Sequence, residues 1–492
     1  MHPNIQTLGQ LKASGYRPKS IKEELRDNLV DILRQRKKVF EGIIGFDDTV
    51  LPDIERAVLS RHNILLLGLR GQAKTRIARL LVHLLDEYIP VVAGSELNDD
   101  PMHPISRRAI DIIAEHGDDT PVAWLHRDQR YVEKLATPDV SVADLIGDVD
   151  PIKAATLKLP YSDERVIHFG LVPHSHRSIF VINELPDLQA RIQVSLFNIL
   201  QEGDIQIRGF KLRLPLDIQF VFTANPEDYT NRGSIITPLK DRIESQILTH
   251  YPKTIEIARK ITRQEAHLAA DQKAHITVPD LLEVLLERIA FTARESELVD
   301  SKSGVSARLS ISAYENLVST AERRMLINKE QKASARITDF WGVVPAITGK
   351  VELVYEGEQE GPYQVAMHLL GTALKEMFLA HFPNPDKLKK GRDTDPFGVI
   401  RAWFSGSNSI ELLIDAPEKD YRKALDEVAG LRKLVEKELA ITGEEAYPYM
   451  ELALHGLAEF NVVNKDIVEA GVSFRDLLAG MLNDTDFDED EY

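Results

Sequence analysis

Cysteine is absent from this sequence of 492 residues. A chain without thiols forms no disulfides and no thiolate metal sites, which fits a reducing compartment. Long apolar runs are missing too: no stretch of about 18 consecutive apolar residues occurs, so we expect no transmembrane helix. The first residues also lack the charged and then apolar pattern of a signal peptide. These absences lead us to expect a cytoplasmic protein without a membrane span.

The chain has fewer basic than acidic residues. The chain has 60 lysine and arginine residues against 77 aspartate and glutamate residues, and its formal net charge is −17. This balance disfavours non-specific nucleic-acid binding over the whole surface, although a local basic patch would still allow it. The length suggests about three domains. With 43% hydrophobic and 28% charged residues, the composition is that of an ordinary globular protein with ample material for a core.

The stretch from residue 64 to residue 81 changes character twice. Residues 64–67 form an apolar run typical of a buried strand, a glycine-containing segment follows, and the residues after 75 have helical spacing. Strand, loop and helix in this order predict a phosphate-binding loop, whose backbone N–H groups surround the phosphates. Lys74 would reach the β and γ oxygens, and the Thr75 hydroxyl would hold Mg²⁺. The predicted nucleotide-binding residues of the loop are Gly68, Leu69, Arg70, Gly71, Gln72, Ala73, Lys74 and Thr75.

One position of this loop departs from the usual pattern. Ala73 stands where a second glycine is expected before the lysine. Alanine accepts right-handed helical geometry but not a positive φ at the low cost of glycine, so we expect a usable but constrained loop. The alternative interpretation is an ordinary glycine-containing turn between strand and helix, with Lys74 as a surface residue.

A second buried strand is predicted at residues 178–182, and it ends in the polar pair Asn183 and Glu184. Ligands of open α/β sheets bind at the carboxyl ends of strands. Glu184 is therefore a candidate to orient or deprotonate an attacking water. Asn183 stands where an aspartate would normally help to hold the water shell of the metal, and an amide is a neutral and weaker partner for Mg²⁺. The alternative is a polar strand end that only caps the following turn.

Further strands and short helices follow this pair. Another buried strand is predicted at residues 220–226, with Asn225 at its end. A short helix is predicted at residues 239–243. Residues 204–214 predict a hairpin that turns at Gly209. Its basic residues could touch a substrate or nucleic acid, although a solvated hairpin is the simpler interpretation. They are Arg208, Lys211 and Arg213.

The remaining predictions concern the two ends of the chain. An amphipathic helix that begins with a capping box is predicted at residues 20–38, and a second helix is predicted at residues 51–60. Ile43 and Ile44 lie in a short apolar segment that either covers an adenine or joins the core. From about residue 252 helices dominate, apart from a predicted strand at 351–355. The last nine residues, 484–492, are mostly acidic and are predicted to form a disordered tail.

His174 and His176 are two possible metal ligands close together in the sequence. Because no third ligand accompanies them, we interpret them as ordinary loop residues rather than as a metal site.

Taken in order, these motifs resemble the AAA+ ATPases, and within them the MoxR and magnesium-chelatase I-subunit branch. Residues 68–75 are similar to Walker A, and residues 180–184 are similar to Walker B with Asn183 in place of aspartate. Residues 223–226 resemble the sensor 1 strand, 241–243 the arginine-finger element, and 304–308 sensor 2. Residues 169–173 resemble the segment after the helix-2 insert of this branch. The resemblance covers residues 40–325.

The resemblance implies an α/β fold: a P-loop AAA+ core with a parallel sheet flanked by helices, a C-terminal helical lid, and an additional, mostly helical C-terminal region. The expected parts are an N-terminal helical extension (1–40), the nucleotide-binding domain (41–251), the lid (252–330), the C-terminal region (331–483) and the acidic tail (484–492). Asn225 would polarise the water or the γ-phosphate, and Arg242 and Arg308 would complete the catalytic set.

The implied function is ATP hydrolysis with Mg²⁺ by a homo-oligomeric ring, expected to be a hexamer. Such a ring would remodel a protein partner or promote metal insertion, and the implied partner carries a von Willebrand A-type domain. Two other functions stay open: a nucleic-acid motor or loader that uses the basic hairpin, and a nucleotide-gated scaffold that barely hydrolyses ATP. A GTPase is disfavoured because no N-K-x-D element occurs at a suitable spacing.

Overall fold

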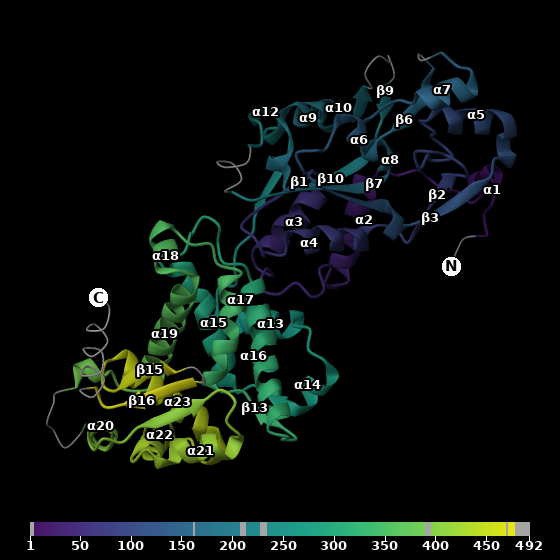
Figure 1. The fold of residues 1–492 in the computed structure, drawn as a ribbon. Helices are drawn as coiled ribbons and strands as arrows, with labels where there is room; N and C mark the ends of the chain where they lie inside the picture. The colour runs from purple at the N-terminus through teal and green to yellow at the C-terminus, as the bar shows by residue number, and fades with distance from the viewer. Residues whose placement is uncertain are drawn as a thin grey trace. The chain divides into compact units, whose positions relative to one another are not determined.

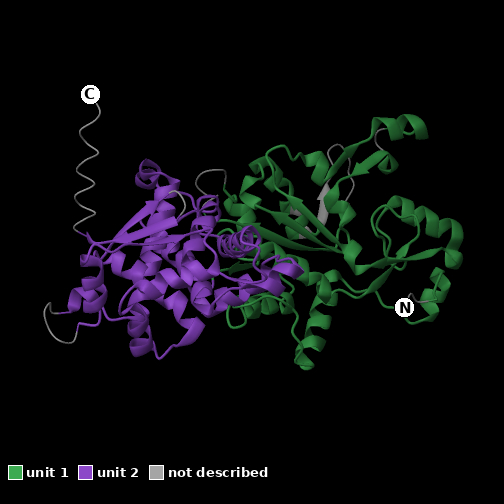
Figure 2. Ribbon diagram, turned by 60° about the horizontal axis from the view of Figure 1, so that its bottom comes forward, with its two compact units in different colours: residues 1–251 green, residues 252–492 purple. Residues whose placement is uncertain are grey.

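A computed structural model describes residues 4–160, 163–206, 213–226, 234–388, 395–468 and 471–477. The chain divides into two compact units, residues 1–251 and 252–492, which Figure 2 shows in green and purple. Each unit is built around its own hydrophobic core, and each is described separately. Within the described residues, no helix combines the length and apolarity that crossing a membrane needs.

The first unit contains a five-stranded parallel sheet in the order β11-β1-β10-β7-β4. The α/β fold class is thereby confirmed. The strands are β1 (Ile64–Leu67), β4 (Tyr131–Leu135), β7 (Ser178–Asn183), β10 (Ile218–Ala224) and β11 (Ser245–Leu248). β1, β7 and β10 are buried along their whole length, as expected for apolar strands covered on both faces.

Helices cover both faces of this sheet, and each face has its own core cluster. One cluster joins alternate sheet residues to α2 (Ile21–Arg34), α3 (Val50–Leu59) and α4 (Lys74–Leu80). The other joins the remaining sheet residues to α9 (Ala190–Ser195) and α10 (Phe197–Glu202). Figure 1 shows α3 and α4 on one side of the sheet and α9 and α10 on the other. The predicted capping box of α2 is confirmed: Ser20 accepts from the Glu23 backbone N–H, and Glu23 accepts from that of Ser20.

Smaller elements of the first unit lie outside this sheet. β2 (Tyr88–Val92) pairs antiparallel with β3 (Val122–His126), β5 (Gly147–Val149) with β6 (Ile167–Phe169), and β8 (Asp204–Gln206) with β9 (Arg213–Pro215). The last pair confirms the predicted hairpin, whose tip, residues 207–212, lies outside the described residues. The other helices are α1 (Leu8–Ala13), α5 (Arg107–His116), α6 (Val142–Leu145), α7 (Pro151–Leu157), α8 (Leu171–His174) and α12 (Thr237–Lys240).

The second unit is mainly helical, with one core cluster that runs from Leu281 to Phe474. Its helices are α13 (Ile255–Glu265), α14 (Ala270–His275), α15 (Asp280–Glu295), α16 (Arg308–Ile327), α17 (Val344–Thr348), α18 (Tyr355–Glu360), α19 (Pro362–His381), α20 (Gly398–Ser405), α21 (Glu418–Glu427), α22 (Leu431–Leu439) and α23 (Ala446–Glu459). Its strands are β12 (Ile276–Thr277), β13 (Ala333–Ser334), β14 (Ile410–Leu413), β15 (Asn464–Val468) and β16 (Gly471–Arg475).

The predicted strand at 351–355 is wrong. Tyr355 begins α18, and Leu353 makes only an isolated bridge to Val299. An apolar run this short is a weak strand signal. Residues 351–354 form neither a helix nor a strand, and Val351 and Leu353 pack against the core cluster. The three-stranded antiparallel sheet β14-β16-β15 was not predicted.

Candidate functional site

The loop between β1 and α4 is tightly curved. Gly71 has φ 72°, and Ala73, the residue before Lys74, has φ 56° and ψ 14°. The position that departs from the usual glycine therefore does adopt a left-handed conformation, which costs a non-glycine residue about 1–2 kcal/mol. The expected constraint on this loop is thus located at Ala73, immediately before α4.

Lys74 is buried beneath this loop. Its side chain is 8% exposed, and its Nζ donates to the carbonyl oxygens of Leu69 (2.9 Å) and Gly68. The alternative interpretation of Lys74 as a surface residue is therefore wrong. The loop carbonyls hold a positive charge at its base, where it can meet phosphate oxygens.

Contacts with the end of β11 support the start of the loop. The Thr249 hydroxyl donates to Gln72 Oε1 at 2.6 Å, and the Thr249 N–H donates to the Leu67 carbonyl at 2.8 Å. A Cβ on Gly68 would collide with both side chains. Gly68 is therefore required for close packing, and this role of Thr249 was not visible in the sequence.

The carboxyl ends of three neighbouring strands meet beside this loop. Leu67 of β1 is in register with Ala224 of β10, and Phe222 of β10 is in register with Ile182 of β7. The parallel register therefore brings Asn225 and the Asn183–Glu184 pair to the sheet edge at which the loop begins.

Hydrogen bonds through Thr223 organise the end of β7. The buried Thr223 hydroxyl donates to Asn183 Oδ1 at 3.0 Å and accepts from the Glu184 backbone N–H at 3.2 Å. Glu184 has φ 56°, another left-handed non-glycine position. Strained backbone of this kind often accompanies functional side chains. The contribution of Thr223 was also missed, because it depends on which strands are neighbours.

The residues at this edge fit a magnesium nucleotide. Asn225 is 4% exposed, and within the described part of the chain its Oδ1 has no hydrogen-bond partner although it is buried. An unsatisfied buried acceptor is rare and calls for an external donor. Lys74 provides positive charge, and Thr75 and Asn183 provide the oxygen donors that Mg²⁺ prefers.

The remaining predicted site residues are Ile43, Ile44, Arg242 and Arg308. Ile43 is buried in the core cluster with α2, α3 and α4, and Ile44 is partly exposed. Arg242 donates to Gln201 Oε1 (3.0 Å) and to the Pro238 carbonyl (2.7 Å), and it forms no ion pair with a carboxylate of the described residues. Arg308 is the first residue of α16 and belongs to the second unit.

The predicted loop histidines bond to backbone atoms. His174 Nδ1 lies 2.8 Å from the Gly170 carbonyl oxygen, and His176 Nδ1 accepts from the Asp217 N–H at 3.1 Å. Burial and the neighbouring Arg177 lower the pKa of His176 to about 4, so His176 is neutral at physiological pH.

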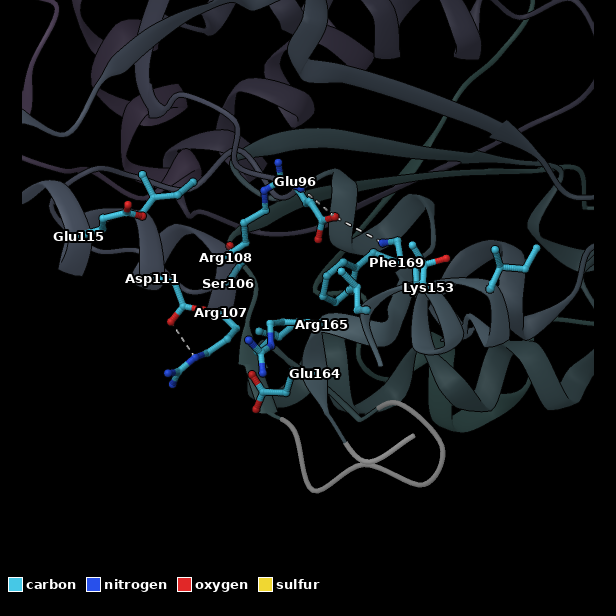
Figure 3. Close-up of a pocket in the computed structure, with 15 residues that line it drawn as sticks. Glu96, Ser106, Arg107, Arg108, Asp111, Glu115, Lys153, Glu164, Arg165 and Phe169 are labelled. Atoms are coloured by element: carbon cyan, nitrogen blue, oxygen red, sulfur yellow. Dashed lines mark hydrogen bonds and ion pairs between the residues drawn. The ribbon is translucent and has the colours of Figure 1, made fainter. Parts of the chain in front are cut away.

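A separate cavity of about 480 Å³ lies between α5, α7 and the residues before β6 (Figure 3). Two ion pairs join charged residues of its lining: Arg107 Nε lies 3.0 Å from an Asp111 oxygen, and Lys153 Nζ lies 3.4 Å from a Glu96 oxygen. None of the predicted site residues lines this cavity.

No protein-family model matches the sequence. Among solved structures, the chain is similar to a proposed ATPase from Cytophaga hutchinsonii at 16% identity and a TM-score of 0.28, covering 73% of this chain and 97% of that one. It is similar to a structure of the magnesium-chelatase subunits BchI and BchD at 20% identity and a TM-score of 0.34. The match covers 65% of this chain and 98% of that one. It is also similar to Hsp104 in a complex with ATPγS and casein at 13% identity and a TM-score of 0.38. That match covers 66% of this chain and 53% of the Hsp104 chain. Values this low assign no activity to the chain.

Proposed function

We propose that this chain is an AAA+ ATPase of the MoxR and magnesium-chelatase type, which binds ATP with Mg²⁺ at the loop of residues 68–75 and hydrolyses it. The observation that supports this most is the convergence at one sheet edge. The buried amine of Lys74, the Asn183–Glu184 pair and the unsatisfied Asn225 all lie at the carboxyl ends of adjacent strands. Motifs far apart in the sequence thus meet where a nucleotide would be bound.

Each of these residues has a distinct role in the proposal. Lys74 would leave the loop carbonyls and bind phosphate oxygens, and the Thr75 hydroxyl would bind the metal. Glu184 would accept a proton from the attacking water. Asn225 would accept a hydrogen bond from that water through Oδ1 or donate from its amide to the γ-phosphate. Mg²⁺ supplies charge neutralisation at the phosphates when it is bound. Ile44, which is partly exposed, would lie next to the adenine, whereas Ile43 packs in the core cluster.

The finer parts of the proposal follow from the resemblance. The active species is a homo-oligomeric ring, expected to be a hexamer, in which Arg242 reaches a neighbour's nucleotide and Arg308 acts from the lid. ATP turnover would remodel a protein partner, for example one with a von Willebrand A-type domain, or promote metal insertion. Arg208 and Lys211 of the hairpin tip, on which the nucleic-acid alternative depends, lie outside the described residues.

Calorimetry with ATP tests the proposal. We expect Lys74→Ala to weaken ATP binding strongly, because it removes a charge-assisted contact from a shielded site. Lys38→Ala is the matched control, since it removes the same charge from a side chain that is 77% exposed. Equal ATP affinity of the Lys74→Ala variant and the parent protein would overturn the proposal.

Asn183 favours a second candidate, a nucleotide-gated scaffold that binds ATP and barely hydrolyses it. The side chain at the end of β7 carries no charge, and its amide oxygen already accepts from Thr223. Steady-state phosphate release separates the two candidates. A parent protein that binds ATP but releases phosphate no faster than a protein-free control would be a scaffold.

A further inference from the structure

Both ends of the Asn183 amide are engaged. Its Nδ2 donates to Glu133 Oε1 at 2.6 Å, and its Oδ1 accepts from the Thr223 hydroxyl at 3.0 Å. This orientation places the amide nitrogen, a donor, against a carboxylate oxygen, an acceptor. The Glu133 carboxylate is thus hydrogen-bonded to Asn183, the residue that stands where an aspartate would normally end β7.

Glu133 reaches this position from the neighbouring strand. It lies on β4, which pairs with β7 so that Leu135 is opposite Asn183 and Glu133 is opposite Val181. Because side chains alternate along a strand, Glu133, Val181 and Asn183 point to the same face of the sheet. Val181 belongs to the core cluster that includes residues of α4, so this is the face beneath the helix that carries Thr75.

A contact with α4 places Glu133 on the side of that helix that bears Thr75. Arg79 Nε donates to Glu133 Oε2 at 2.9 Å, and Arg79 Nη2 donates to Oε1 at 3.2 Å. Arg79 follows Thr75 by four residues, so the two side chains lie on the same face of α4. Glu133 thus contacts Asn183 of β7 directly and contacts α4 through Arg79, one helical turn after Thr75.

Of the donors to Glu133, Arg79 is the easiest to displace. The Arg79 side chain is 64% exposed, whereas that of Glu133 is 22% exposed. Water screens the charge of an exposed guanidinium and competes for its hydrogen bonds, so its ion pair is readily exchanged. The remaining donors, Asn183 Nδ2 and the Tyr131 hydroxyl at 3.1 Å, would keep Glu133 in place. Burial and the charge of Glu133 raise the pKa of Tyr131, so its hydroxyl keeps the proton that it donates.

We propose that Glu133 supplies the negative charge that the end of β7 lacks, and that it holds the hydrated Mg²⁺ of the nucleotide together with Thr75. This inference rests on the proposed ATP-binding function. A carboxylate that accepts hydrogen bonds from metal-bound waters is a typical partner of Mg²⁺. Asn183 then acts as a positioning residue, which holds Glu133 through its amide. Arg79 competes with the metal for the same carboxylate.

Metal binding tests this inference without reference to turnover. Mn²⁺ is titrated into protein saturated with a non-hydrolysable ATP analogue, and free Mn²⁺ is followed by electron paramagnetic resonance. We expect Glu133→Gln to weaken Mn²⁺ binding about 10- to 100-fold, the usual effect of removing an outer-shell partner. Asn183→Asp in the Glu133→Gln background should restore most of this loss, because it returns one carboxylate to the end of β7.

Arg79→Gln is the matched control, and its expected effect has the opposite sign. If Glu133 serves the metal, removing its competitor leaves Mn²⁺ binding unchanged or tighter. If Glu133 only forms the ion pair with Arg79, Glu133→Gln and Arg79→Gln weaken Mn²⁺ binding to the same extent. That result would overturn the inference. It is also overturned if Glu133→Gln leaves Mn²⁺ binding at the parent level.

Nucleotide affinity in EDTA separates this failure from failure of the proposed function. Glu133→Gln should match the parent protein in EDTA, which also shows that the loop is folded. A parent protein that binds no ATP analogue with or without metal would refute the ATPase proposal itself. A parent protein that binds the analogue, with Glu133→Gln indistinguishable from it in Mn²⁺, would refute only the role of Glu133.

Discussion

Glu184 combines an acidic side chain with a backbone conformation that few non-glycine residues adopt. Its φ is 56°, and its N–H donates to the Thr223 hydroxyl, a contact between two strand ends. A left-handed residue directly after a buried strand turns the chain sharply, so that the side chain emerges at the sheet edge. At the scale of single residues, this geometry supports Glu184 as the general base of the proposed reaction.

Replacing Glu184 by glutamine should separate binding from chemistry. The amide keeps the size and hydrogen-bonding capacity of the side chain but cannot accept a proton from water. We expect ATP affinity close to that of the parent protein and turnover lower by about 10²- to 10⁴-fold, the usual range for a positioned acid or base. Calorimetry and steady-state phosphate release measure the two quantities. Parent-level hydrolysis by this variant would show that another residue activates the water.

Asp217 predicts a pH dependence of stability. It accepts from the Ile21 backbone N–H at 2.7 Å, and burial raises its pKa from 3.8 to about 6. A folded-state pKa above the unfolded value means that its stabilising contribution is complete below pH 3.8 and is lost as the pH rises through about 6. Burial of the ionised form therefore destabilises the protein at neutral pH.

Asp217→Asn should remove this cost and keep an acceptor for the Ile21 N–H. We expect the variant to match the parent protein near pH 4 and to exceed its stability by about 1–3 kcal/mol at pH 7, since one pKa unit corresponds to about 1.4 kcal/mol. Thermal unfolding across this pH range measures the difference. The opposing titration of His176, whose pKa is lowered to about 4, is common to both proteins and cancels. A difference that does not vary with pH would contradict the assignment.

At the scale of elements, a buried ion pair links α2 to the turn before β4. Arg130 Nη1 and Nη2 donate to the two Glu24 oxygens at 2.7 and 2.6 Å, and both side chains are almost completely buried. Arg130 Nε also donates to the Arg177 carbonyl at 2.9 Å, and the Asp86 N–H donates to Glu24 Oε1. These bonds join the N-terminal helix to β4, the strand that carries Glu133.

Breaking this pair from one side should be more costly than removing it altogether. Arg130→Met leaves the Glu24 charge buried without its partner, and we expect a loss of about 3–5 kcal/mol in the free energy of unfolding. The Glu24→Gln/Arg130→Met double variant should recover much of that loss, because no isolated charge remains. Urea unfolding of both variants measures the difference. A double variant less stable than Arg130→Met would show that packing, not charge, dominates.

At the scale of the whole molecule, the proposed ring needs an arginine at each boundary between subunits. Arg242 is held by Gln201 and the Pro238 carbonyl, and its guanidinium lies 5.0 Å from the Phe197 ring centre. A guanidinium stays charged and can bridge phosphate oxygens as charge develops. We therefore expect Arg242 to act on the nucleotide of a neighbouring subunit.

Mixing two inactive variants tests this expectation. Arg242→Ala subunits keep an intact loop, and Lys74→Ala subunits keep Arg242, so each variant alone should be inactive. An arginine supplied across a subunit boundary is worth about 10³- to 10⁵-fold in related phosphoryl transfers. When mixed, some interfaces pair an intact loop with an intact Arg242, and part of the ATPase activity should return. Co-assembly shown by sedimentation without any return of activity would exclude action across subunits.

Local sequence patterns determined the strand–loop–helix at residues 64–80, the buried strands at 178–183 and 218–224, and the capping box of α2. These features depend on hydrophobic periodicity and on glycine and capping residues close together in the chain. β4 was missed because its five residues include Glu133 and Lys134, which suit the last strand of a sheet but carry no clear strand pattern.

Only the tertiary structure decided which distant residues meet at the candidate site. Glu133 and Asn183 are 50 residues apart, and Gln72 and Thr249 are 177 apart. These contacts follow from the strand order β11-β1-β10-β7-β4, which depends on long-range pairing that no local pattern encodes. The left-handed conformation of Ala73 is likewise imposed by its surroundings, because alanine has no intrinsic preference for it.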